Sequence, residues 1–425
     1  MLSRRFFLQG AAIAGCSVAA HPFMSSVTLA AVPGEQRLVV IILRGAMDGL
    51  DIVQPYGDPL LAQLRPDFPV GPDKGATDLD GFFALHPAMV ELMPLWKTGE
   101  LGFAHAVSTP YRDKRSHFDG QDMLEAGTGM DVPLSMVRDG WLNRLLQQMP
   151  GARAETAYSV GDDELKILSG TAAALSWAPD ASLILSSQGR TLLDMIYHDD
   201  PLFRQAASEA MQITDGGDNA EDGTTDPDSP DLMAEPMMAA PADGMAAPGA
   251  PGAPAPLKGA VGAAASLADF AASRLRGETR IAAFSLNGWD THRGQEAAIR
   301  GPATQLAAMV TTLRQQLGPV WDKTLVLGMT EFGRTARQNG TKGTDHGTGG
   351  AMLMAGGALK GRKVYGKWPG LADANLYAGR DLMPTADIRA YAGWALRGMY
   401  GVPVEVLETS IFPGLDLGAD PRFLA

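Results

Sequence analysis

Two short segments of the chain each place an aspartate close to a histidine among glycines. The segment NGWDTHRGQ contains Asp290 and His292, and GTKGTDHGTGG contains Asp345 and His346. Carboxylates and neutral imidazoles are ligands of divalent metal ions, and several of them gathered at one point stay undercoordinated without a cation. Either segment alone is a weak signal. Together they indicate a metal site, provided that the fold brings them to one place.

The elements that would position these residues follow from the apolar pattern. Short segments that are continuously apolar, rather than alternating, are typical of buried strands. Amphipathic stretches between them, at 86–99 and 301–318, indicate helices. This alternation predicts an α/β domain with a mostly parallel sheet and helices on both faces. We expect strands at 37–43, 101–107, 156–160, 182–186, 280–286, 324–329 and 350–356.

Polar residues follow several of these strands directly. Asp48 follows the first strand, Arg115 and Ser116 follow the second, and Glu331 and Arg334 follow the strand at 324–329. The carboxyl ends of parallel strands meet at one edge of an open α/β sheet, where such sheets bind ligands. We therefore expect these loops and the two Asp/His segments at one rim.

Each residue also has a structural interpretation. Asp48, before a glycine, is typical of a turn. Ser116, with Asp119 three residues further on, is typical of a helix cap. A cap at a helix N-terminus is compatible with a nucleophile, because the N–H groups there favour an anion. His86 and His198 lie outside the expected rim and are interpreted as helix-flank or surface residues.

Composition excludes some classes of function. The 425 residues carry a formal net charge of −13 without a cluster of Lys and Arg, which argues against nucleic acid as a partner. Segment 213–257 contains nine acids, no Lys or Arg and no aromatic residue. Such a segment cannot bury enough apolar area to fold. We therefore predict a disordered acidic insert within a single domain over 31–425.

The N-terminus has the order of an export signal. Arg4 and Arg5 precede an apolar run and small residues up to Ala30, which resembles a twin-arginine signal. We predict a signal peptide over 1–30, the twin-arginine machinery as a partner, a periplasmic or secreted protein, and no membrane span. A lipoprotein box ending at Cys16 is the alternative, disfavoured because the apolar run before it is short. Cleavage near Ala30 leaves no cysteine, which excludes thiolate ligands.

Several segments carry a resemblance that extends over nearly the whole mature chain except the insert. LRGAMDGLDIVQPYGDP, GWLNRLL, NGWDTHRGQ and TEFGRTARQNGTKGTDHGTGG, with the twin-arginine start, resemble an exported bacterial family of unknown function that is described as sulfatase-like. That family is distantly similar to the alkaline phosphatase superfamily, whose mutases carry a Gly-Thr-Asp-His segment before an apolar strand. The resemblance implies a three-layer α/β/α fold of the alkaline phosphatase type.

The resemblance also implies an activity. It implies an exported metal-dependent hydrolase or transferase acting on small phosphate or sulfate esters. Ser116 would be the nucleophile, and Arg115 and Arg334 would pair with the anionic group. The cofactor would be a divalent ion, Zn, Mn, Ca or Mg, with a single ion rather than two as one outcome. The ligands expected are Asp48, Asp290, His292, Glu331, Asp345 and His346.

Two departures from the superfamily pattern support an alternative. Phe332 stands where the superfamily has a histidine, and Asp290 and His292 are two residues apart rather than four. The alternative is a non-catalytic periplasmic binding or assembly protein that keeps the fold with a degenerate metal site.

Overall fold

The structure is a computed structural model that describes residues 34–179, apart from 131, 133–136, 138 and 164, and residues 257–425. The signal peptide expected over 1–30, the strand at 182–186, His198 and the insert at 213–257 lie outside these residues. In the described ranges, no helix combines the length and the apolar character that a membrane crossing requires.

A nine-stranded sheet forms the centre of the described domain. Its order is β11-β5-β10-β9-β1-β8-β6-β7, with β12 paired to β5. Six of the seven strands expected from the sequence are present with boundaries within one residue. The bounds are β1 (Arg37–Leu43), β5 (Leu101–Ser108), β6 (Ala157–Val160), β7 (Leu175–Trp177), β8 (Ile281–Leu286), β9 (Thr324–Met329), β10 (Gly350–Ala355), β11 (Val364–Tyr365) and β12 (Ala386–Asp387).

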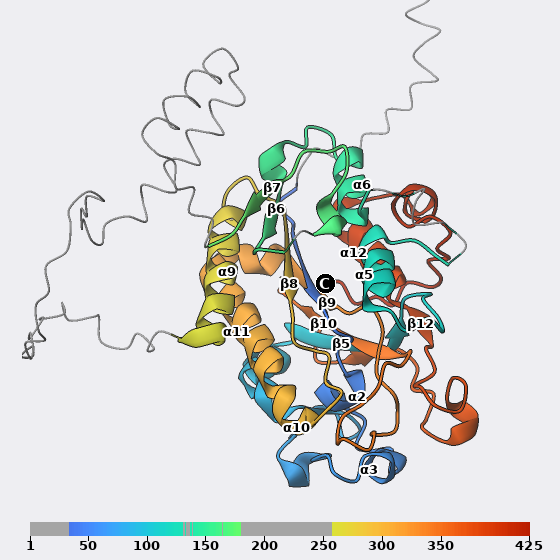
Figure 1. Ribbon diagram of the computed structural model, residues 1–425. Coiled ribbons are helices and arrows are strands. Elements are labelled where there is room, and N and C mark those ends of the chain that lie inside the picture. The colour runs from blue at the N-terminus through green and yellow to red at the C-terminus, as the bar shows by residue number, and fades with distance from the viewer. Residues whose placement is uncertain (1–33, 131, 133–136, 138, 164, 180–256) are drawn as a thin grey trace, which may run out of the picture. The chain divides into compact units, whose positions relative to one another are not determined.

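Helices cover both faces of this sheet. In Figure 1, α9 (Gly259–Leu275) and α11 (Arg300–Leu317) lie on one side, and α5 (His117–Ala126), α6 (Trp141–Gln148) and α12 (Ile388–Tyr400) lie on the other. Alternate β1 side chains pack into the two layers. Val39, Ile41 and Leu43 join the cluster under α9 and α11, whereas Leu38, Val40 and Ile42 join the cluster under α6 and α12. Burial on both faces explains why the strands are continuously apolar.

The two expected helices are present, one of them in two pieces. The segment expected at 301–318 is α11. The segment expected at 86–99 is a 3-10 helix over Pro87–Leu92 followed by α4 (Met93–Thr98). Pro94 at the start of α4 explains the division, because proline has no N–H to continue the preceding hydrogen-bond pattern.

Shorter elements complete the domain. The helices are α2 (Gly49–Ile52), α3 (Leu60–Leu64), α10 (Gln295–Ala298) and α13 (Val404–Val406), followed by a π-helical turn over Leu407–Ile411. A small second sheet consists of β2 (Val53–Gln54), β3 (Thr77–Asp78) and β4 (Ala84–Leu85). Short 3-10 helices lie at Pro72–Lys74, Ala154–Thr156, Lys166–Leu168, Gly318–Lys323 and Asp373–Asn375.

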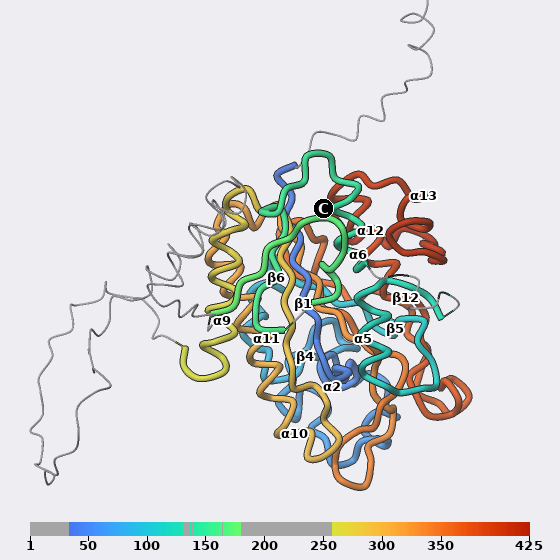
Figure 2. The backbone as a smooth tube through the Cα atoms, turned by 45° about the horizontal axis from the view of Figure 1, so that its top comes forward, coloured from blue at the N-terminus to red at the C-terminus, as the bar shows by residue number. Residues whose placement is uncertain are grey.

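Strand β10 runs antiparallel to both neighbours, β5 and β9, while the other described pairs of the large sheet are parallel. The segment between β9 and β10 contains no helix, and a parallel connection would need a crossover of a dozen or more residues that usually includes one. Because β10 is reversed, the loop before it lies at the same edge as the loops after the parallel strands. Figure 2 shows α2 and α10, the first helices after β1 and β8, at that end.

His105 ties the middle of β5 to the segment after β1. Its Nε2 lies 3.2 Å from the carbonyl O of Gly49 and 3.0 Å from that of Val53, and its Nδ1 accepts the Ala106 N–H. These partners require a neutral ring with the proton on Nε2. Burial lowers the pKa of His105 to about 4.

This histidine gives an expected pH dependence of stability. Between pH 6.5 and pH 4 the unfolded chain protonates residue 105 and the folded chain does not, so the free energy of unfolding should fall as pH falls through this range. The lowered pKa corresponds to about 3 kcal/mol. Urea unfolding of parent and His105→Gln over this range measures the effect, and the variant should show the shallower pH profile. Equal profiles would assign the acid sensitivity to other groups.

Candidate metal centre

Three histidines surround one carboxylate oxygen at the carboxyl edge of the sheet. From Oδ1 of Asp290, Nε2 of His292 lies 3.1 Å away, that of His346 3.2 Å and that of His117 3.4 Å. The Nε2 atoms of His292 and His346 are 2.9 Å apart. The ligand atoms of His117, Asp290 and His346 all lie within 4.8 Å of one another. These three residues form a group that could hold a metal ion, and His292 borders it directly.

The loop after β8, the loop between β9 and β10, and the start of α5 bring these residues together. Asp290 and His292 lie between β8 and α10, His346 lies between β9 and β10, and His117 is the first residue of α5. The glycine-rich loop fits because a Cβ on Gly343 would lie 2.2 Å from the His292 carbonyl carbon. Similarly, a Cβ on Gly45, whose φ is +113°, would lie 2.6 Å from the Asp290 nitrogen. Loops without these glycines could not approach so closely.

Each histidine is oriented through its other ring nitrogen. Nδ1 of His117 lies 2.7 Å from Oε1 of Glu331, and Nδ1 of His292 lies 3.3 Å from Oδ1 of Asp345. Nδ1 of His346 lies 2.9 Å from the backbone carbonyl O of Arg115. Ionised carboxylates and carbonyls only accept hydrogen bonds, so all three Nδ1 atoms carry protons. In the neutral tautomers, the Nε2 atoms of all three rings are unprotonated, and they lie within 3.4 Å of Oδ1 of Asp290.

Charges around the centre favour an ionised Asp290. Burial raises its pKa, but Arg334, His292 and His117 outweigh burial and lower it. Nη2 of Arg334 donates to Oδ1 of Asp290 at 2.7 Å. Burial lowers the pKa of His346, whereas the hydrogen bond to Glu331 raises that of His117. The centre thus combines an anionic oxygen with imidazole lone pairs.

Nε2 of His117 is a buried polar atom without a hydrogen-bond partner among the described residues. Its 3.4 Å contact with Asp290 is an ion-pair distance that lacks hydrogen-bond geometry. Buried polar atoms usually find a partner, so an unpaired nitrogen beside Asp290 supports a bound ion at this centre.

Glu331 orients His117 and lies wholly inside the protein. Its Oε1 accepts the N–H groups of Gly45 and Ala46 at 3.0 and 3.1 Å, in addition to His117 and Gln121. Its Oε2 accepts the Thr330 hydroxyl. Burial raises the pKa of Glu331, but these donors, with His117 first, lower it overall. A carboxylate engaged in this way acts as a support for His117.

Phe332 is part of the wall of the centre. Its ring stacks on His117 at 5.2 Å between centroids and 24°, and lies 5.3 Å from the ring of His346. This aromatic side chain therefore packs against two of the imidazoles of the centre.

Asp48 lies elsewhere, in a buried ion pair. Both of its oxygens accept from Arg65, at 2.7 and 3.1 Å, and Oδ2 also accepts from Gln295 at 2.6 Å. Its Oδ1 further caps α2 through the Leu50 N–H. These donors occupy both oxygens of Asp48, so the structure does not bring this predicted ligand into the His/Asp/His group.

Breaking this ion pair should destabilise the protein strongly. Arg65→Met leaves the Asp48 carboxylate buried without its cation, which costs about 3–5 kcal/mol in comparable cases. Chemical unfolding measures the loss. Adding Asp48→Asn to Arg65→Met should recover part of it, because the uncompensated charge is removed. The amount of metal bound per folded chain should be the same in Arg65→Met, in the double variant and in the parent. A loss of metal that appears only when Asp48→Asn is added would instead make Asp48 a ligand.

The remaining predicted residues lie next to the centre. Ser116 is the N-cap of α5, with Oγ 3.4 Å from the Asp119 nitrogen, as its capping interpretation requires. Arg115 is exposed and has a φ of +54°. Arg334 is buried against Asp290, and a contact of either arginine with a substrate anion stays a prediction. Asp345 accepts from Asn339 and lies against His292, so it supports a ring.

His117 is the residue that sequence reasoning did not assign. It follows Ser116 at the start of α5, after the second expected strand, and thus lies at the expected rim. The sequence analysis gave the adjacent Ser116 the role of nucleophile and gave His117 no role. A histidine at the start of a helix that follows a rim strand was the available signal.

Comparison with known proteins gives one family. A family profile described as a protein of unknown function (DUF1501) matches residues 102–392, a range that includes all three histidines and Asp290. Neither the curated proteins nor the solved structures compared with the chain gave a match.

Proposed function

Because the chain belongs to the DUF1501 family, whose function is unknown, we propose an activity from its own site: an exported metal-dependent hydrolase or transferase of phosphate or sulfate esters. One ion is held by His117, His292, His346 and Asp290. The observation that carries this proposal is the gathering of three Nε2 atoms within 3.4 Å of one carboxylate oxygen.

The spacing of these atoms supports a compact ion. A tetrahedral ion with bonds of about 2.0–2.1 Å separates its ligand atoms by about 3.3 Å. Four of the six separations between these atoms, 2.9, 3.1, 3.2 and 3.4 Å, lie around that value. Without an ion, these Nε2 atoms could donate to Asp290 only if the rings took up a second proton, and burial disfavours that charged form for His346.

The donor set favours zinc or a similar transition ion over calcium and magnesium. Three imidazoles and one carboxylate suit Zn²⁺, and Mn²⁺ more weakly, whereas Ca²⁺ and Mg²⁺ prefer oxygen ligands. The acceptors on the three Nδ1 atoms are the supports that metal-bound histidines usually have.

Ser116 is the nucleophile in this proposal. The residues on both sides of it contact the centre: the Arg115 carbonyl accepts from His346, and His117 is a ligand. A bound ion supplies positive charge for the oxygens of the ester and lowers the pKa of a hydroxyl. The Ser116 hydroxyl gives its proton to solvent, and its oxygen forms the new bond to phosphorus or sulfur while the bond to the leaving oxygen breaks and that oxygen takes up a proton. Water or an alcohol then attacks the same atom, the bond to Ser116 breaks, the Ser116 oxygen regains a proton, and the attacking oxygen loses its own to solvent. The N-terminus of α5 favours the anion.

We also propose that the chain is exported through its twin-arginine segment and that its sheet is of the alkaline phosphatase type. Support comes from Arg4 and Arg5 at the N-terminus and from the Gly-Thr-Asp-His segment before β10. Export of a folded chain suits a protein that takes up its ion in the cytoplasm. Cell fractionation tests the location.

A screen of generic esters tests the activity. The parent protein, loaded with Zn²⁺ or Mn²⁺, is incubated with aryl phosphate and aryl sulfate esters, and release of the aryl alcohol is followed. Turnover that requires the ion supports the proposal. A protein that binds the ion but turns over neither class supports a non-catalytic binding or assembly role, for which the single compact centre would be a structural site.

A further inference from the structure

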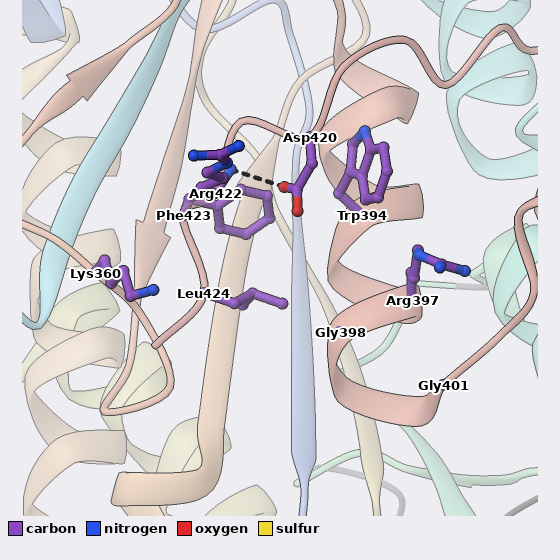
Figure 3. Close-up of a pocket in the computed structure, with 9 residues that line it drawn as sticks. All are labelled: Lys360, Trp394, Arg397, Gly398, Gly401, Asp420, Arg422, Phe423 and Leu424. Atoms are coloured by element: carbon purple, nitrogen blue, oxygen red, sulfur yellow. Dashed lines mark hydrogen bonds between the residues drawn. The ribbon is translucent and has the colours of Figure 1, made fainter.

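A hollow of about 550 Å³ lies between α12 and the C-terminal segment. Figure 3 shows that the side chains of Lys360, Arg397 and Arg422 end at separate places around it, with Arg397 turned away from the rest of the lining. Among the described residues, no contact brings these cations to one point. The polar side chains beside the metal centre, in contrast, are joined by hydrogen bonds.

Two amide side chains, those of Gln295 and Asn339, each contact both of the segments that carry the predicted ligands. We call residues 290–292 the first ligand segment and residues 344–346 the second. A backbone hydrogen bond joins the two segments directly, from the Thr344 N–H to the Thr291 carbonyl at 3.2 Å. The two amides add side-chain hydrogen bonds to this junction.

The Gln295 side chain lies wholly inside the protein and uses all of its hydrogen-bonding capacity. Its Nε2 donates to Oδ2 of Asp48 at 2.6 Å and to Oδ2 of Asp51 at 2.9 Å. The two carboxyl groups fix the orientation of the amide, because Nε2 can only donate. Its Oε1 therefore accepts the hydroxyls of Thr291 at 2.8 Å and Thr344 at 2.6 Å. One of these hydroxyls comes from each ligand segment.

The Asn339 side chain is engaged as completely, in the loop before the second ligand segment. Its Nδ2 donates to the carbonyl O of His292 at 2.9 Å and to Oδ1 of Asp345 at 3.0 Å. Its Oδ1 accepts the N–H groups of Thr341 and Gly343, both at 3.0 Å. The same Oδ1 of Asp345 lies 3.3 Å from Nδ1 of His292. Asn339 thus also holds the carboxylate that orients this ring.

The spacing of the ligand atoms depends on how the two segments are placed. Nε2 of His292 in the first segment and Nε2 of His346 in the second lie 2.9 Å apart. We propose that Gln295 and Asn339 are positioning residues, which clamp the two ligand segments together in the arrangement that accepts the ion. The proposal rests on the proposed function for the presence of an ion, whereas the clamp itself belongs equally to the metal-free protein.

An exchange of amide for acid tests Asn339. Asn339→Asp keeps the shape of the side chain but replaces the donor with an oxygen that repels Asp345. Zinc affinity, measured against a chromophoric chelator, should fall about 10- to 100-fold, as for residues that support metal ligands. Gln338→Glu is the matched control, because it makes the same change one residue away, where both ends of the amide bond to Asp67. It should leave the affinity unchanged.

Isosteric variants test the buried amide. Gln295→Met keeps the length of the side chain and removes all four of its hydrogen bonds, so it should weaken zinc binding by about 10- to 100-fold. Thr344→Val removes one hydroxyl only and should weaken binding about tenfold, whereas Thr344→Ser keeps the hydroxyl and should bind as the parent does. This pair decides the question if Gln295→Met fails to fold.

Hydrogen exchange of the zinc-free protein separates the clamp from the ion. The Thr344 N–H should exchange at least about tenfold faster in Asn339→Asp and Thr344→Val than in the parent, and at the parental rate in Gln338→Glu. A parent that binds no zinc would contradict the proposed function, and the exchange rates would then decide on the clamp. Parental exchange in both variants, or an equal loss of zinc affinity in Gln338→Glu and Asn339→Asp, would overturn the proposal.

Discussion

The Ser116→Ala variant is expected to lose turnover of aryl phosphate or sulfate esters while keeping its metal. Removal of a catalytic nucleophile lowers kcat by factors of about 10⁴ to 10⁶ in well-studied hydrolases. The side chain belongs to a residue whose neighbours, Arg115 and His117, both contact the centre. Steady-state kinetics together with metal analysis of the same preparation measures both expectations.

The capping role of Ser116 requires a control. Ser116→Ala also removes the helix cap of α5, which costs about 1 kcal/mol. Ser116→Asn keeps a good N-cap but has no hydroxyl, so it should be as inactive as the alanine variant and nearly as stable as the parent. If Ser116→Asn retained parental turnover, Ser116 would be a cap and nothing more.

The second large effect is expected at the ion itself. His346→Ala should weaken zinc binding by about 100-fold or more, because one of four ligands is removed from a site whose total binding energy is shared among them. His346 is neutral at neutral pH, since burial lowers its pKa, and its Nε2 faces Asp290 at 3.2 Å. Competition with a chromophoric chelator measures the change in affinity.

Two further variants distinguish the loss of a direct ligand from the loss of a supporting residue and from a change outside the centre. Glu331→Gln alters the support of His117 and should weaken binding by only about 10- to 100-fold. His86→Asn changes a histidine whose Nδ1 accepts the Ala88 N–H outside the centre, and it preserves the cap, so zinc affinity should not change. A loss in Glu331→Gln that is well above about 100-fold and equal to that in His346→Ala would give Glu331 the role of a direct ligand.

Much of the fold could be predicted because it depends on patterns that are local in the chain. Burial on both faces made β1, β5, β8 and β9 continuously apolar, and their boundaries follow from that alone. The rim was predictable for the same reason, since residues after parallel strands share an edge. The reversal of β10 could have been inferred from the helix-free segment that precedes it.

The pairing of side chains at the rim could not be predicted, because it is decided between segments far apart. The sequence predicts Asp48 as a ligand, but in the structure its carboxylate pairs with Arg65, seventeen residues further on. The sequence likewise predicts Glu331 as a ligand, but in the structure its carboxylate accepts the N–H groups of Gly45 and Ala46. Which carboxylate faces the ion and which supports a ring depends on these contacts. His292 and His346, in contrast, were identified from the sequence as rim residues.

The central claim is that a single ion joins His117, His292, His346 and Asp290. Anomalous diffraction from crystals of zinc-supplemented protein, recorded above and below the zinc edge, tests it most directly. We expect one peak, about 2.0–2.2 Å from the three Nε2 atoms and from a carboxylate oxygen of Asp290. A crystal saturated with zinc that shows no peak there, or a peak bound by Asp48 and Glu331 instead, would contradict the claim.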